Sequence, residues 1–213
     1  ADLRLGAEGS DCRVIADGAD LGPLHVPLPG AHMVLNALMA VAAVRAAGVH
    51  VAPSTLGDCE RVRRRFTVHG APGGVRVVED YGHHPTEVAA TIAAAALSGG
   101  RVQVVFQPHR HTRTADCFAE FLAAFDRAHA VALLPIYAAG EAPLPGVSSR
   151  GLAEALAARR GCEGVLVQHV ERAEDAAAFL ASHARPGDTC LVLGAGDVNR
   201  CVAPLLERLA ARP

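Results

Sequence analysis

The chain has 213 residues, 51% of them apolar, with a formal net charge of −2 and no lysine. A charge so close to balance gives no electrostatic reason to propose a nucleic-acid partner. No apolar stretch is long enough to predict a membrane span, and no secretory signal is visible. The six cysteines are scattered without a C-x-x-C pair, which indicates reduced thiols and predicts a cytoplasmic protein.

The first third of the chain predicts short strands followed by helices. DLRLG, CRVIA and LHVPLPG are short apolar segments separated by glycine and aspartate turns, as expected of strands. An alanine-rich helix is predicted at about 31–48, and a second helix at 53–62. The glycine- and proline-rich HGAPGG at 69–74 is the best candidate for a linker. We therefore predict one domain segment over 1–69 and a domain over 70–213.

From Val75 onward, short apolar runs alternate with amphipathic segments, a pattern typical of parallel strands joined by crossover helices. Strands are predicted at 75–80, 101–107, 130–135, 164–168 and 188–194. Helices are predicted at about 85–97, 113–127, 148–160, 171–184 and 197–211. The fold class is therefore α/β: a doubly wound, mostly parallel, Rossmann-like sheet, preceded by a partial α/β segment.

Unusual polar residues follow the predicted strands. EDYGHH (79–84) ends the first strand of this series, FQPHRHTR (106–113) the second, PIYAAGEAPLPG (135–146) the third, and LGAGD (193–197) the last. Ligands of open α/β sheets bind outside the carboxyl ends of the strands, so these segments predict a binding site at one edge. LGAGD resembles only half of a dinucleotide fingerprint, and we interpret it as a structural turn.

The histidines and arginines of these segments allow several interpretations. His83, His84, His109 and His111 could bind a metal, could cap strand ends, or could contact a polar substrate, which we favour. No carboxylate or thiolate lies at a familiar ligand spacing, so we predict no metal site. Arg110 and Arg113 stand at the start of a helix, where a compensating anion is expected. A carboxylate is the natural ligand for their guanidinium groups.

Several long motifs resemble the Mur ligase family. EDYGHHPTE, FQPHRHTRT, LLPIYAAGEAPLPGVSS and LGAGD are similar to the C-terminal domain of these enzymes. PGAHMVLNALMA (29–40) and RRRF (63–66) resemble the end of their central ATPase domain. The tyrosine and glycine of DYGHHP favour the branch that uses L-alanine over the murein-peptide recycling branch. The resemblance extends, in the right order, over essentially the whole chain.

The resemblance implies an ATP- and Mg²⁺-dependent ligase of peptidoglycan synthesis. In that reaction ATP phosphorylates the lactyl carboxylate of UDP-N-acetylmuramate, and the amine of L-alanine attacks the acyl phosphate. The UDP-sugar domain, the P-loop lysine and the Mg²⁺ ligands would precede Ala1, so the chain is expected to be a fragment. We expect this fragment to lack activity alone, to bind no cofactor, and to self-associate through exposed apolar surface.

The resemblance also implies roles for single residues. Tyr81, His83, Arg110 and Arg113 match positions of the amino-acid pocket. Positions that contact ATP are matched by His32, Asn36, Arg65 and Asp80. Two residues depart from the family pattern: Met33 replaces a polar residue beside the adenine, and Glu79 replaces an aspartate.

Two rival functions stay open at this point. A stand-alone module could bind an amino acid or nucleotide without chemistry, and the sequence upstream of Ala1 would distinguish it. A histidine-dependent metal hydrolase would require bound metal after purification.

Overall fold

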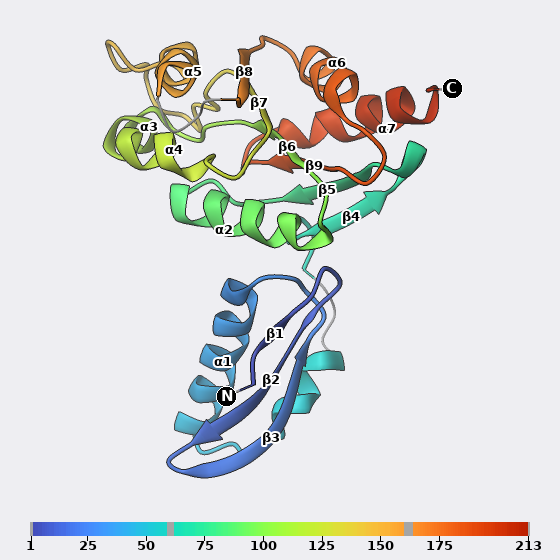
Figure 1. Cartoon of the computed structure of the whole chain (residues 1–213). Coiled ribbons are helices and arrows are strands. Elements are labelled where there is room, and N and C mark those ends of the chain that lie inside the picture. Colours follow the sequence, from blue (N-terminus) through green and yellow to red (C-terminus); the bar gives the residue numbers. More distant parts are fainter. Residues whose placement is uncertain (1, 59–61, 160–163, 213) are drawn as a thin grey trace.

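The computed structural model of the protein describes residues 2–58, 62–159 and 164–212. Two sheets follow one another along the chain, a small one near the N-terminus and a larger one that carries most of the helices (Figure 1). The predicted α/β class is confirmed. In the part of the chain that the structure describes, no helix is both long and apolar enough to cross a membrane.

Three antiparallel strands form the first sheet in chain order: β1 (Arg4–Leu5), β2 (Ser10–Ala16) and β3 (Ala19–Val26). Asp17 and Gly18 join β2 to β3 with φ angles of 52° and 77°. Aspartate and glycine tolerate this left-handed conformation, and the resulting tight turn suits a two-residue hairpin. Buried and exposed side chains alternate along β2, so that one face of the sheet packs against a helix.

That helix is α1 (Ala31–Ala46), which is apolar on almost every side. Met33, Val34 and Val41 are buried against the sheet, whereas Leu35 and Met39 are 61% and 70% exposed. The expected exposed apolar surface is therefore present, while self-association through it stays a prediction. After α1, a short 3-10 helix (Pro53–Asp58) replaces the helix predicted at 53–62, whose residues 59–61 lie outside the described part.

The second sheet has six strands in the order β4-β5-β9-β6-β7-β8. β4 is antiparallel to β5, and the other neighbours are parallel, which confirms the mostly parallel sheet. Their bounds are β4 (Thr67–Gly70), β5 (Arg76–Asp80), β6 (Val102–Phe106), β7 (Ala130–Leu133), β8 (Leu166–His169) and β9 (Thr189–Leu193).

The linker predicted at 69–74 is wrong. Gly70 pairs with Val77 of β5, so the segment begins within the edge strand β4. A 3-10 turn at Pro72–Gly74 then leads directly into β5. The domain boundary between residues 69 and 70 stays a prediction, and it falls within this edge strand.

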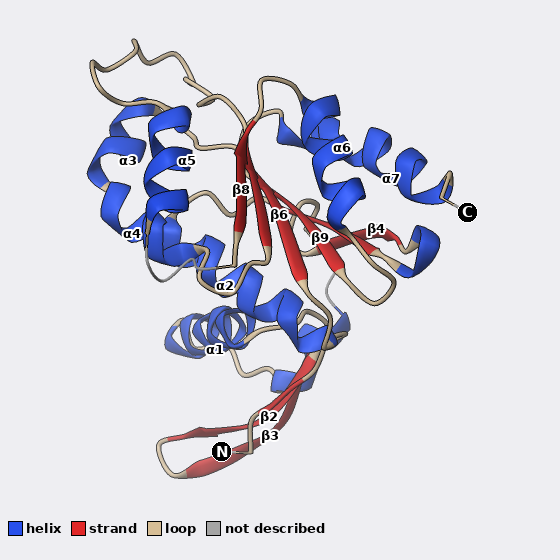
Figure 2. Cartoon of the chain, turned by 45° about the horizontal axis from the view of Figure 1, so that its top comes forward, coloured by secondary structure: helices blue, strands red, loops and turns tan. Residues whose placement is uncertain are grey.

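Helices cover both faces of the six-stranded sheet (Figure 2). On one face lie α2 (Pro85–Ala95), α4 (Phe118–Ala124) and α5 (Ser149–Ala158), and on the other α6 (Ala173–His183) and α7 (Val202–Ala210). Phe106 of β6 packs its ring 5.4 Å from the rings of both Phe121 and Phe125 on the first face. Each face therefore buries a separate apolar core, as a doubly wound sheet requires.

Two predicted helices differ in detail. The helix expected at 113–127 is two helices, α3 (His111–Asp116) and α4, which break at Cys117 with φ −105° and ψ 21°. The helix expected at 197–211 begins as a 3-10 turn at Val198–Cys201. Neither change moves the strand ends that carry the polar segments.

Candidate functional site

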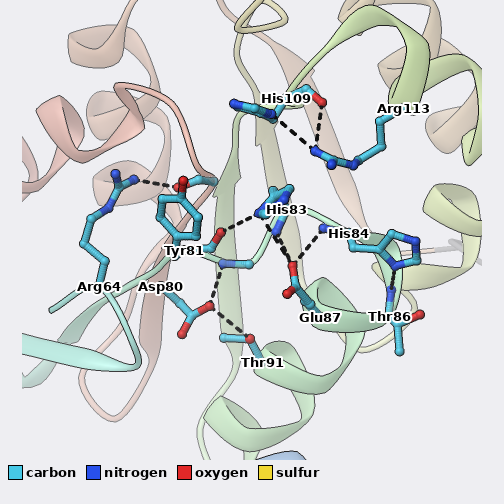
Figure 3. A network of polar contacts seen from close by, with 12 residues as sticks. Arg64, Asp80, Tyr81, His83, His84, Thr86, Glu87, Thr91, His109 and Arg113 are labelled. Atoms are coloured by element: carbon cyan, nitrogen blue, oxygen red, sulfur yellow. Dashed lines mark hydrogen bonds and ion pairs between the residues drawn. The ribbon is translucent and has the colours of Figure 1, made fainter. Parts of the chain in front are cut away.

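The carboxyl ends of three central strands are level at one edge of the six-stranded sheet. Leu193 at the end of β9 pairs with Asp80 of β5 on one side and with Phe106 of β6 on the other. The polar segments that follow β5 and β6 therefore reach the same edge, as predicted from the sequence (Figure 3). The turn after β9, which we interpreted as structural, lies between them.

A capping network fixes the turn between β5 and α2. His84 is the N-cap of α2, and its imidazole accepts a hydrogen bond from the Thr86 N–H. The Glu87 carboxylate accepts the N–H groups of His83 and His84, at 3.0 and 3.1 Å. Burial alone would raise the pKa of Glu87, but these two donors and the nearby His83 ring hold it below its ordinary value. This reciprocal capping box fixes the backbone of His83 and His84 at the start of α2.

Four rings form a continuous row across the site. Tyr81 and His83 meet edge to face at 5.5 Å, and His83 lies 5.4 Å from His109. His109 then stacks on Tyr137 with ring centroids 5.6 Å apart and an angle of 15°. Arg113 joins the row through its Nη1, which lies 3.2 Å from His109 Nδ1. Of the residues predicted for the amino-acid pocket, His83 and Arg113 thus contact His109, and Tyr81 contacts His83 (Figure 3).

Arg110 has different neighbours. It is the N-cap of α3 with a φ of 71°, and its Nε lies 4.0 Å from Glu141 Oε1. The Glu141 carboxylate also accepts the N–H and hydroxyl of Thr112, at 3.0 and 2.7 Å. These hydrogen bonds from Thr112 hold the pKa of Glu141 below its ordinary value. The anion expected at this helix start is thus supplied by the chain itself, and a direct role for Arg110 stays a prediction.

Of the residues predicted to contact ATP, His32 and Asn36 lie on α1, and Arg65 lies just before β4. Asn36 and Arg65 line a cavity of about 540 Å³ whose walls include Val26, Leu28, Leu56 and Met33. His32 lines a smaller cavity of about 190 Å³ between α1 and α2. Burial lowers the pKa of His32, an effect that the nearby carboxylate of Asp80 opposes and Arg65 reinforces.

Asp80, at the end of β5, holds the segment that leads into β4. Its buried carboxylate accepts the N–H groups of Phe66 and Gly82, at 2.8 and 2.7 Å. Burial raises the pKa of Asp80, although these hydrogen bonds and the charge of Arg65 work in the opposite direction. These contacts give Asp80 a structural role, because it ties Phe66 to the end of β5. Contact between Asp80 and ATP stays a prediction.

Sequence reasoning missed Arg64, which has a φ of 59°. Its Nη2 donates to the carbonyls of Gly194 and Gly196, at 2.6 and 3.2 Å, and its Nε lies 2.8 Å from Glu79 Oε1. The guanidinium carbon also lies 5.0 Å from the centre of the Tyr81 ring.

The three adjacent arginines of RRRF give no sequence pattern that would distinguish Arg64 from Arg63 and Arg65. Tyr137, also missed, could have been found because it follows the strand predicted at 130–135.

In the described ranges, no three histidine, cysteine, aspartate or glutamate side chains come together as potential metal ligands.

Two of the cysteines are fully buried thiols with raised pKa values. Cys190 and Cys201 are buried, and burial raises the pKa of each thiol to about 12. Both stay protonated thiols at neutral pH and serve as core residues. Cys59 and Cys162 lie outside the described residues.

The fold and the polar edge define a class: a doubly wound α/β domain that presents a cluster of polar side chains at the carboxyl ends of its strands, where ligands of such domains bind. The family model for the "Mur ligase, glutamate ligase domain" matches residues 64–196. The chain therefore belongs to the Mur ligase family, as its motifs predicted.

Its relatives include ligases named for L-alanine. The chain is 45% identical over 201 residues to the UDP-N-acetylmuramate–L-alanine ligase of Sorangium cellulosum, covering 92% of this chain and 42% of that protein. The enzyme of the same name from Phenylobacterium zucineum is 42% identical over 221 residues, covering 99% of this chain and 46% of the relative. The chain thus spans less than half the length of these relatives.

Solved structures share the fold. The UDP-N-acetylmuramate-alanine ligase from Thermotoga maritima superimposes with a TM-score of 0.76 at 23% identity, over 97% of this chain and 44% of that one. A murein peptide ligase from Psychrobacter arcticus gives a TM-score of 0.65 at 21% identity, over 99% and 44%. At these identities the likeness describes the fold and does not separate the two activities.

Proposed function

We propose that the chain is the amino-acid-binding region, with part of the nucleotide-binding region, of a ligase that joins L-alanine to UDP-N-acetylmuramate in peptidoglycan synthesis. The observation that carries the proposal is the 45% identity to a ligase of that name over 92% of the chain. The cluster of Tyr81, His83 and Arg113 at the carboxyl edge of the sheet supports it.

In this proposal, Arg113 binds the carboxylate of L-alanine. A guanidinium group presents paired N–H donors that match a carboxylate and keeps its charge at every physiological pH. The Tyr81 and His83 rings, fixed by the cation above Tyr81 and by the capping turn, limit the orientation of the bound amino acid. Holding the amine at a defined angle to the activated carboxylate is the main contribution expected from such residues.

We further propose that residues 1–69 are the end of the central ATP-binding domain. The cavity beside α1 fits a nucleotide base, because its walls are largely apolar and Asn36 adds one amide group. Arg65 lines the same cavity and carries the charge that a phosphate needs. When bound, ATP would supply the phosphoryl group that activates the lactyl carboxylate. Met33 offers no hydrogen bond to the base, so base recognition rests on Asn36 and shape.

The 213-residue chain is expected to be inactive on its own. A P-loop requires a lysine, and this sequence contains none. In the described residues no metal-binding group of three side chains is present, so we assign Mg²⁺ no ligand here. The exposed apolar face of α1 is the part of the chain that we expect to mediate self-association.

An NMR titration with L-alanine tests the proposal, with D-alanine as the stereochemical control. We expect saturable shifts that are largest at the amides of Tyr81, His83 and Arg113. Arg113→Ala is expected to weaken binding by about 10- to 100-fold, because a hydrogen bond to a charged group contributes about 1.5–3 kcal/mol.

Arg13→Ala is the matched control, since Arg13 pairs with Asp20 on the first sheet. It should leave the affinity for L-alanine unchanged. If wild type shows no stereoselective shifts, the isolated chain has no preformed alanine site. Binding that Arg113→Ala leaves intact would contradict the role of that arginine.

A further inference from the structure

The His109 ring is held from two sides at the centre of the site. Tyr137 stacks on one face, and His83 packs nearby at a tilt of 58°. Backbone hydrogen bonds fix the relative position of the two strand-end loops: Tyr137 N–H donates to Pro108, and Arg110 N–H donates to Tyr137, both at 2.8 Å. The position of the His109 ring is therefore fixed by its neighbours in the fold.

The contact with Arg113 determines where the His109 proton lies. Arg113 Nη1 lies 3.2 Å from His109 Nδ1 and 3.4 Å from the His109 carbonyl oxygen. A guanidinium group has five N–H donors and no acceptor. The contact with Nδ1 is therefore a hydrogen bond only when Nδ1 offers its lone pair, which places the single proton of a neutral imidazole on Nε2.

We propose that His109 is a positioning residue of the amino-acid site: its Nδ1 accepts a hydrogen bond from Arg113 and so orients the guanidinium that binds the incoming carboxylate. This inference rests on the proposed function and deepens it. His109 acts only through Arg113. By holding Nη1, it sets the direction in which the other guanidinium N–H groups of Arg113 point. Arginine side chains have many rotamers, so a fixed acceptor reduces the conformational entropy that binding must otherwise overcome.

The surroundings of His109 keep its imidazole neutral. Burial lowers its pKa, and the charges of His83, Arg113 and Arg110 lower it further, while Glu141 partly opposes them. These groups come from the turn after β5, from the start of α3 and from the loop after β7, and Tyr137 covers one ring face. Protonation would turn Nδ1 into a donor that faces another donor. The contact is therefore present at neutral pH and is lost as the pH falls through this lowered pKa.

Two substitutions separate positioning from packing. His109→Asn places an amide oxygen near the position of Nδ1, so it keeps an acceptor but loses the stacked ring. His109→Phe keeps a ring against Tyr137 but removes the acceptor. Titration of each variant with L-alanine should show about tenfold weaker binding for H109F, as expected for one lost charge-assisted hydrogen bond, and less than about threefold for H109N. A packing role alone gives the reverse order.

A second measurement needs no ligand. Nitrogen-15 NMR of the imidazole rings in the wild-type chain should show His109 protonated on Nε2 and bare on Nδ1 at neutral pH. On acidification, the Arg113 side-chain N–H signals should change together with His109. A proton on Nδ1 at neutral pH would overturn the proposal, whatever the ligand does.

The outcomes separate L-alanine binding by the chain from the positioning of Arg113 by His109. If wild type binds L-alanine and H109F binds it equally well, His109 does not position Arg113 and the proposed function stands. If wild type fails to bind L-alanine while the Nε2 tautomer is found, the proposed site fails and the His109 contact is only structural. The amide spectrum of each variant checks that the chain is folded.

Discussion

The two sheets differ in how completely their apolar faces are covered. The six-stranded sheet carries helices on both faces and buries a core on each side. The three-stranded sheet has α1 on one face, and α1 itself presents Leu35 and Met39 to solvent. Nine of the fifteen exposed large hydrophobic side chains in the described residues lie before residue 63, so the first region is the one that lacks a partner surface.

This difference shows that two regions of similar composition can differ in how stably each folds by itself. Both regions are rich in alanine, valine and leucine. The six-stranded region satisfies the layer rule of α/β domains and is expected to be stable by itself. The first region leaves part of its apolar surface in solvent and is expected to be less stable by itself.

The largest expected effect is loss of a core aromatic in the second region. Phe106→Ala removes a fully buried ring that contacts both Phe121 and Phe125, which should lower the free energy of unfolding by about 3–5 kcal/mol. Hydrogen exchange should accelerate throughout the six-stranded sheet and stay unchanged in β2 and β3. Equal acceleration in both sheets would mean that the chain unfolds as one unit.

A smaller effect is expected at the junction of the two regions. Glu87→Ala removes the carboxylate that caps α2 and lines the cavity beside α1, with an expected cost of about 1 kcal/mol. Because the pKa of Glu87 is lowered by folding, this stabilisation is present above the ordinary glutamate pKa and is lost as the pH falls through the folded value. Unfolding curves of both proteins should therefore converge in acid, and a constant difference would exclude the charged cap as its source.

The smallest expected effect on stability is at the exposed face of α1. Leu35→Gln with Met39→Gln exchanges apolar for polar side chains of similar helix propensity, so the free energy of unfolding should change by less than about 1 kcal/mol. Self-association, measured by sedimentation velocity, should weaken. Leu166→Gln is the control, since Leu166 is 50% exposed on β8 of the other sheet. If wild type is monomeric at high concentration, the proposed association is wrong.

Much of the second region could be predicted from the sequence because its signals are local. Short apolar runs marked each parallel strand, and the helix predicted at about 85–97 begins at Pro85 as α2 does. The shared carboxyl edge followed from the topology of parallel sheets, which brought Tyr81, His83 and Arg113 together as expected. The family resemblance was carried by long motifs at these same strand ends.

What could not be predicted depends on contacts between distant residues. The pairing of Gly70 with Val77 places the end of an edge strand inside a segment that resembles a linker. Glu141 reaches the start of α3 from a loop 29 residues away, which no local pattern at Arg110 reveals. The role of Arg64 arises from the turn after β9, 130 residues later in the chain.

The position of β9 has a consequence for how the protein is made. β9 is the last strand in the chain, yet it lies between β5 and β6 at the middle of the sheet. During synthesis, which proceeds from the N-terminus, β5 and β6 leave the ribosome long before the strand that joins them. Nascent chains that end before residue 189 expose two unpaired strand edges, which are templates for aggregation. Truncation by a few dozen C-terminal residues should therefore split the sheet rather than trim it.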